Sequence, residues 1–170
     1  MNSLSFERLL WLVPVFFALH NLEEAPFMEG WSKRLPLKLP IHYTTRQFVI
    51  SVTILTLGGF LATYWGVEVL HNTTGYWIVM GIQAILFFNA SIPHIGSTIR
   101  FRMYSPGVIT ATLITIPFSI YLFQRALGEN IITWKQIWTL LVIAPFAMVL
   151  FAFLSLQIGK AFDKQKRKEE

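Results

Sequence analysis

The chain has 170 residues, of which 54% are hydrophobic and 14% are charged, and it contains no cysteine. Soluble globular domains carry roughly 25% charged residues, so this composition excludes a disordered chain and argues against an ordinary soluble domain. The formal net charge of +5 comes from short basic clusters between apolar runs, a pattern typical of membrane topology signals. We therefore expect membrane lipids, and no nucleic acid, among the partners of this protein.

Five apolar segments follow one another along the chain, each long enough to cross a hydrocarbon core of about 30 Å as a helix. Polar, charged or proline-containing loops separate them. The pattern predicts an all-α, polytopic transmembrane bundle of about five spans, in which residues 1–170 form a single integral membrane domain. The predicted spans are residues 8–25, 47–70, 75–97, 106–126 and 134–160.

The basic residues predict the orientation of the bundle. With the N-terminus outside, only Arg8, Arg125 and Lys135 lie on the outer side, and the other 11 of the 14 Lys and Arg face the cytoplasm. The positive-inside rule strongly favours this arrangement. We therefore expect an outer N-terminus, a cytoplasmic C-terminus and a location in a bacterial cytoplasmic membrane.

The first predicted span ends in three ionisable residues, His20, Glu23 and Glu24. Such residues are rare in membrane helices and usually mark functional sites. At about 100° per residue, Glu23 lies about 60° to one side of His20 and Glu24 about 40° to the other, so all three share one helix face. Two adjacent carboxylates near a helix C-terminus need a metal cation, a proton or an arginine from the inner loops to balance them.

The third predicted span contributes Asn89 and His94 at a similar depth in the membrane, as judged from the rise of about 1.5 Å per residue. Residues five apart lie about 140° apart on an ideal helix. Pro93 interrupts the helix beside His94, so a bend there can turn that imidazole inward. We therefore expect a cavity in the inner leaflet that is lined by His20, Glu23, Glu24, Asn89 and His94.

This ordered set of residues resembles the HXXEE family of small integral membrane proteins, named for the pattern that stands here as His20-x-x-Glu23-Glu24. The family pattern also includes an Asn followed by a His, and a Pro-Gly pair. These features are similar to Asn89, His94, Pro106 and Gly107. The resemblance covers most of the first four predicted spans, and it implies a membrane domain of uncharacterised function.

Two histidines and one carboxylate are the ligand chemistry of hydrolytic zinc sites. Either glutamate can complete the set, and we assign His20, Glu24 and His94 as ligands of a divalent transition metal, in the first place zinc. Glu23 and Glu24 are the candidates for activating water, and Asn89 is the candidate for orienting a carbonyl. Pro106 and Gly107 would let a substrate headgroup approach the backbone. These assignments predict a metal-dependent hydrolase that acts on a lipid-like or membrane-embedded substrate.

Other function classes fit the same residues. A histidine and two carboxylates in an apolar pocket can move a proton between two points of a lipid without a metal, as an isomerase does. The cluster could instead belong to a membrane ligand-binding, transport or immunity-type protein that performs no chemistry. In a purely structural role it would fasten the first span to the third, which explains one His–Glu pair but not two adjacent glutamates.

Overall fold

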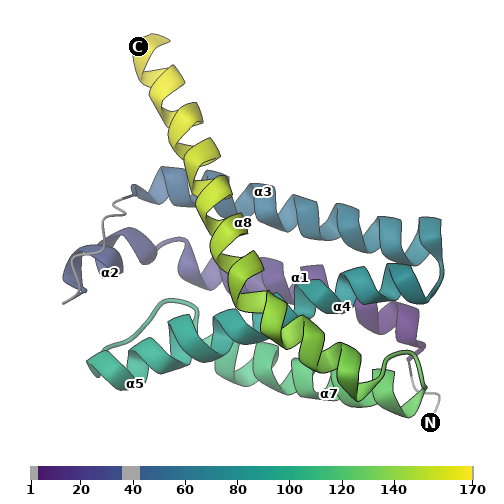
Figure 1. Ribbon diagram of the computed structural model, residues 1–170. Helices are drawn as coiled ribbons and strands as arrows, with labels where there is room; N and C mark the ends of the chain where they lie inside the picture. Colours follow the sequence, from purple (N-terminus) through teal and green to yellow (C-terminus); the bar gives the residue numbers. More distant parts are fainter. Residues whose placement is uncertain (1–3, 36–42, 170) are drawn as a thin grey trace.

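The computed structural model describes residues 4–35 and 43–169, with side chains up to residue 162. All secondary structure in these residues is helical, which confirms the predicted all-α class (Figure 1). The elements, in which η marks a π-helix, are α1 (Phe6–Glu24), α2 (Met28–Arg34), α3 (Thr45–Tyr64), η1 (Trp65–Leu70), α4 (Thr73–Asn89), η2 (Ala90–Gly96), α5 (Ser97–Phe101), α6 (Val108–Thr110), η3 (Ala111–Thr115), α7 (Ile116–Gly128) and α8 (Trp134–Glu169).

Four continuous helical segments of the described chain are long and apolar enough to cross a membrane, which supports the prediction of a membrane protein. They have 26, 29, 21 and 29 residues, and they correspond to the second to fifth predicted spans. Their bounds are Thr45–Leu70, Thr73–Phe101, Val108–Gly128 and Trp134–Phe162.

Helix α1 covers the first predicted span, but it is not one of these four segments. It has 19 residues and carries charged side chains at both ends, Glu7 and Arg8 at the start and Glu23 and Glu24 at the finish. The described chain therefore contains four candidate spans, and membrane crossing by the first predicted span, residues 8–25, remains a prediction.

Helices α1, α3, α4 and α7 lie alongside one another, and α8 crosses them obliquely against α3 and α4 (Figure 1). The core lies where α1, α4 and α7 meet and is filled by Leu10, Val13, Met80 and Leu122, all fully buried. Large apolar side chains also cover the outward faces of the helices, as expected when lipid is the solvent. Examples are Leu57, Leu61, Leu113, Phe146 and Val149.

The short helix α2 is fixed to the start of α3 by one carboxylate. Glu29 accepts hydrogen bonds from the Lys33 ammonium at 2.6 Å and from the Thr45 backbone N–H and hydroxyl at 2.6 and 2.9 Å. Helices α2 and α5 lie at the same end of the bundle (Figure 1). This contact therefore positions α2 at the end of the bundle where the ionisable residues of α1 gather.

The basic residues on which the predicted orientation rests are only partly described. At one end of the bundle, Lys33 and Arg34 belong to α2, Arg100 belongs to α5, and Arg102 directly follows α5. Lys38 and the side chains of the basic tail from residue 163 onward lie outside the described residues. The orientation, with the N-terminus outside, remains a prediction.

Candidate metal centre

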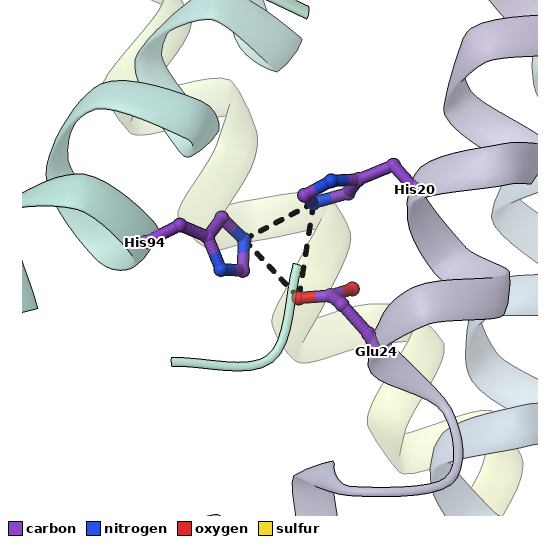
Figure 2. Close-up of side chains that lie close together, drawn as sticks. All are labelled: His20, Glu24 and His94. Atoms are coloured by element: carbon purple, nitrogen blue, oxygen red, sulfur yellow. Dashed lines mark hydrogen bonds and ion pairs between the residues drawn. The ribbon is translucent and has the colours of Figure 1, made fainter. Parts of the chain in front are cut away.

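Three potential ligand atoms from two helices converge on one point (Figure 2). His20 and Glu24 lie one turn apart on the same face of α1, and His94 comes from η2. The Nε2 atoms of the two imidazoles are 3.1 Å apart, and Glu24 Oε1 lies 3.8 Å from His20 Nε2 and 3.1 Å from His94 Nε2. All three residues are buried, with exposed fractions of 3%, 6% and 2% for His20, Glu24 and His94.

These separations match the edges of a small tetrahedron of metal ligands. Zinc binds imidazole nitrogen and carboxylate oxygen at about 2.0–2.2 Å, so two ligand atoms of a tetrahedral site lie about 3.3–3.6 Å apart. The observed values of 3.1, 3.1 and 3.8 Å bracket that distance. One metal ion at the centre could therefore reach all three atoms with only small side-chain movements.

A π-helical segment brings His94 beside Asn89. Residues 90–96 form η2, which contains Pro93, and π-helices close hydrogen bonds between residues five apart. Two residues at that spacing therefore lie on nearly the same face, whereas an ideal α-helix would separate them. The Asn89 amide nitrogen lies 3.0 Å from His94 Nε2 and 3.3 Å from His20 Nε2. The structure thus turns His94 inward by a change of helix type.

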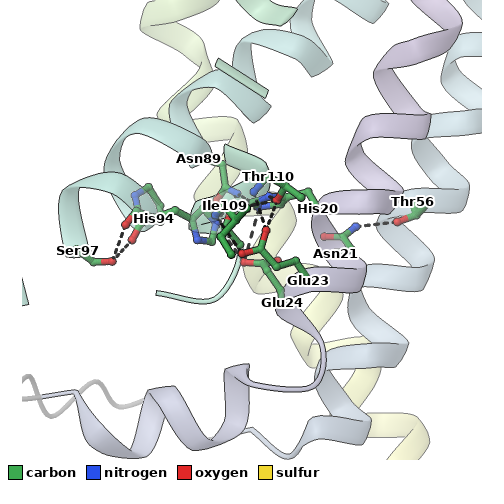
Figure 3. Close-up of polar contacts among 12 residues, drawn as sticks. His20, Asn21, Glu23, Glu24, Thr56, Asn89, His94, Ser97, Ile109 and Thr110 are labelled. Atoms are coloured by element: carbon green, nitrogen blue, oxygen red, sulfur yellow. Dashed lines mark hydrogen bonds and ion pairs between the residues drawn. The ribbon is translucent and has the colours of Figure 1, made fainter. Parts of the chain in front are cut away.

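The other ring nitrogen of His20 is held by a hydroxyl from a different span. His20 Nδ1 lies 2.8 Å from Thr110 Oγ1, and this hydroxyl faces two acceptors, Glu23 Oε2 at 2.6 Å and the Gly107 carbonyl at 3.1 Å (Figure 3). Its single hydrogen goes to one of these acceptors, so it must accept a hydrogen from His20 Nδ1. The Nε2 atom of His20 therefore presents a lone pair to the centre of the cluster.

His94 is oriented in a similar way. Its Nε2 faces Glu24 and His20, and its Nδ1 is buried without a well-aligned hydrogen-bond partner among the described residues. The backbone of Pro106 lies close enough to interact with the ring. Since proline has no N–H, this neighbour is the carbonyl oxygen; with Nε2 facing the cluster, a proton on Nδ1 is the one that could be donated to it. Histidines that bind metals commonly donate their second N–H to a carbonyl or a carboxylate-linked partner.

The two adjacent glutamates have different surroundings. Glu24 points to the two imidazoles, whereas Glu23 accepts four hydrogen bonds at the start of the Val108–Gly128 span (Figure 3). The donors are the Tyr104 hydroxyl at 2.7 Å, the Ile109 N–H at 3.0 Å, and the Thr110 N–H and hydroxyl at 2.7 and 2.6 Å. Free N–H groups and the helix dipole at a helix N-terminus favour a carboxylate. Glu23 is thus linked to His20 through the Thr110 hydroxyl.

Gly107 closes the cluster. Its φ of +88° is in the left-handed region that favours glycine. A Cβ at this position would lie 2.7 Å from His20 Cε1, 2.9 Å from Glu24 Cγ and 3.0 Å from His94 Cε1. The backbone of Gly107 therefore lies directly against all three potential ligands, with Ser105 and Pro106 fully buried beside it.

Most of the residues expected from the sequence come together here, and two further residues were not expected. His20, Glu24, His94 and Asn89 form the cluster, and Gly107 covers it. Thr110 and Tyr104 complete the surroundings through Glu23. A threonine and a tyrosine near a predicted helix start match no functional sequence pattern. They could have been predicted only from the need of the Glu23 carboxylate for hydrogen-bond donors.

Comparison with known proteins identifies relatives but no activity. A family described as "Protein of unknown function with HXXEE motif" matches residues 11–122. "Uncharacterized protein YrkK" from Bacillus subtilis (strain 168) is 28% identical over 141 residues, which cover 83% of this chain and 89% of that protein. No solved structure matches the chain. The matched region contains every residue of the cluster and its cover.

Proposed function

The chain belongs to the HXXEE family, a family of unknown function, and we propose that it is a membrane metalloprotein in which His20, Glu24 and His94 bind a divalent transition metal, zinc in the first place. The observation that carries the proposal is the convergence of three buried ligand atoms at separations of 3.1–3.8 Å. Both imidazoles would bind through Nε2, which leaves Nδ1 of His20 for Thr110 and would leave Nδ1 of His94 for the Pro106 carbonyl.

Charge balance supports a cation at this point. The Nδ1–H assignments leave two imidazole lone pairs and a carboxylate facing one another in a buried space, and the Asn89 amide is the neighbouring donor. The two N–H groups of that amide can serve the two lone pairs, but they leave the buried Glu24 carboxylate without a counter-charge, which is costly. A divalent ion would satisfy all three groups at once.

We further propose that the reaction is hydrolysis of a lipid-like or membrane-embedded substrate at the inner leaflet of a bacterial cytoplasmic membrane. A metal in such a site supplies Lewis acidity and lowers the pKa of a bound water. Glu24 would hold the metal, Thr110 and Glu23 would fix the tautomer of His20, and Asn89 would orient the substrate carbonyl. The Ser105–Gly107 backbone would have to move aside before a headgroup could reach the ligands.

Elemental analysis tests the metal. The protein would be purified without a histidine tag, beside a His20→Ala, His94→Ala double variant and a His71→Ala control. His71 contacts the Val67 carbonyl and is no part of the cluster. We expect about one zinc per chain in the wild type and in the control, and almost none in the double variant. A folded wild type that binds no transition metal, even after incubation with zinc, would refute the proposal.

A separate assay tests hydrolysis. Zinc-loaded protein would be mixed with vesicles that contain ester-linked and amide-linked lipids, and released products would be measured by mass spectrometry. We expect product from the wild type and a loss of at least 100-fold in Glu24→Gln. Zinc binding without any product would make metal binding, and not hydrolysis, the function of the site.

A metal-free acid–base reaction is the second candidate, and one contact favours it. His94 Nε2 and Glu24 Oε1 are 3.1 Å apart, close enough to share a proton in place of a metal. A folded, metal-free wild type that binds or isomerises a lipid would select this candidate.

A further inference from the structure

The Asn89 side chain brings a fourth polar group to the same cluster. Its terminal amide atom is 3.0 Å from His94 Nε2 and 3.3 Å from His20 Nε2. With the three separations among His20, Glu24 and His94, five of the six edges of a four-ligand set lie between 3.0 and 3.8 Å. A tetrahedral zinc or cobalt site requires edges of about this length.

The amide has the chemistry to act as a fourth ligand. Without a metal, its NH₂ group donates to the two Nε2 lone pairs, which is the orientation seen here (Figure 3). A metal would take those lone pairs and leave the NH₂ group facing a cation. A half-turn about the terminal torsion exchanges nitrogen and oxygen at almost the same positions. It would bring Oδ1, a metal ligand, to the position that Nδ2 now occupies.

The Gly107 backbone closes another side of the cluster. The Gly107 backbone lies so close that a single added Cβ would be 2.7–3.0 Å from atoms of His20, Glu24 and His94. All three residues are at most 6% exposed. In this closed arrangement the amide of Asn89 is the group positioned to complete the coordination.

We propose that Asn89 is the fourth ligand of the metal in the closed site, bound through Oδ1, and that it keeps the metal inaccessible until the side chain turns away. This inference rests on the proposed metal site. It adds a mode of regulation, because a four-coordinate centre of protein ligands offers no open position for water or substrate. Displacement of Asn89 then becomes the step that exposes the metal, and the freed amide is left beside the incoming carbonyl.

The probe is azide added to the cobalt-loaded protein in detergent micelles. Cobalt(II) reports its coordination through visible absorption bands, so the readout needs no substrate and no activity. We expect no spectral change with azide in the wild type and a clear change in Asn89→Ala, with azide binding at least tenfold tighter in that variant. Asn89→Asp keeps a ligand oxygen at the same place, so we expect it to behave like the wild type.

The outcomes separate this inference from the proposed function. A wild-type protein that binds cobalt and also binds azide as tightly as Asn89→Ala would overturn the role of Asn89 while preserving the metal site. A wild type that binds no cobalt would overturn both. Should Asn89→Ala fail to fold, the wild type and Asn89→Asp still test the inference. Azide binding by both proteins would show that the metal has an open coordination position, and it would overturn the role of Asn89.

Discussion

Replacing Gly107 by alanine should destabilise the protein and disrupt the proposed metal centre. Its φ of +88° costs a residue with a Cβ about 1–2 kcal/mol. The added Cβ would also lie 2.7 Å from His20 Cε1 and 2.9 Å from Glu24 Cγ, and forcing extra atoms into a packed site costs about 1–3 kcal/mol. The two effects together amount to about 2–5 kcal/mol. For a chain of this size, that corresponds to a fall in Tm of about 4–20 °C.

The assay for Gly107→Ala is thermal unfolding in detergent, with and without zinc, together with a zinc-binding titration. Gly58→Ala is the matched control, because Gly58 lies within α3 and a Cβ there would meet nothing within 4 Å. We expect the control to be as stable as the wild type or slightly more stable. The reasoning would be refuted by a Gly107→Ala protein that unfolds at the wild-type temperature and binds zinc with the wild-type affinity.

Three further predictions address the neighbouring residues. Thr110→Val removes the hydroxyl that orients the His20 imidazole and keeps the shape of the side chain, so we expect zinc affinity to fall about 10–100-fold in a titration. The control is Thr63→Val, at a buried hydroxyl without a hydrogen-bond partner among the described residues, which should leave zinc affinity unchanged. Glu23→Gln should still bind zinc but lower Tm, since it weakens the charge-assisted hydrogen bonds at the start of the Val108–Gly128 span. Glu24→Gln should lose zinc. Equal loss of zinc in both variants would contradict the assignment of Glu24, and not Glu23, as the metal ligand. The Lys33 ammonium, followed by the backbone and hydroxyl of Thr45, lowers the pKa of Glu29 from 4.5 to about 2, so its stabilising effect is complete above about pH 4.5 and lost as the pH falls through 2. The Tm difference between wild type and Glu29→Gln, measured from pH 7 down to pH 2, should therefore shrink below pH 4.5, and a constant difference would count against this role.

The helical architecture could be predicted from the sequence because it depends on the length of the apolar runs. Four predicted spans coincide with helical segments that are long and apolar enough to cross a membrane. The first is a helix too, but four charged residues at its ends, Glu7, Arg8, Glu23 and Glu24, make it a weaker candidate for a span. The apolar composition of a segment predicts whether that segment is compatible with lipid, but it does not determine how deeply a helix with polar ends enters the membrane.

The candidate site was predictable only in part, and the reason is geometric. His20 and Glu24 are one turn apart, so their shared face follows from the helical repeat. The position of His94 depends on the π-helical turn η2, which a regular 3.6-residue repeat does not contain. Thr110 reaches His20 because the loop of residues 102–107 returns the chain to the cluster, and no local sequence pattern predicts such a long-range contact.

The HXXEE spacing has a physical logic in which each position serves a different neighbour. On a helix, the residue four places after a histidine lies slightly to one side of it, and the residue three places after lies further to the other side. Glu24 can therefore share a metal with His20, while Glu23 turns toward the N-terminus of the Val108–Gly128 span. Its hydrogen bond from Thr110 then connects the second glutamate back to the same imidazole. A single helical turn thus supplies two potential ligands and a carboxylate that is linked to one of them, which gives each of the two adjacent glutamates a separate role in the proposed site.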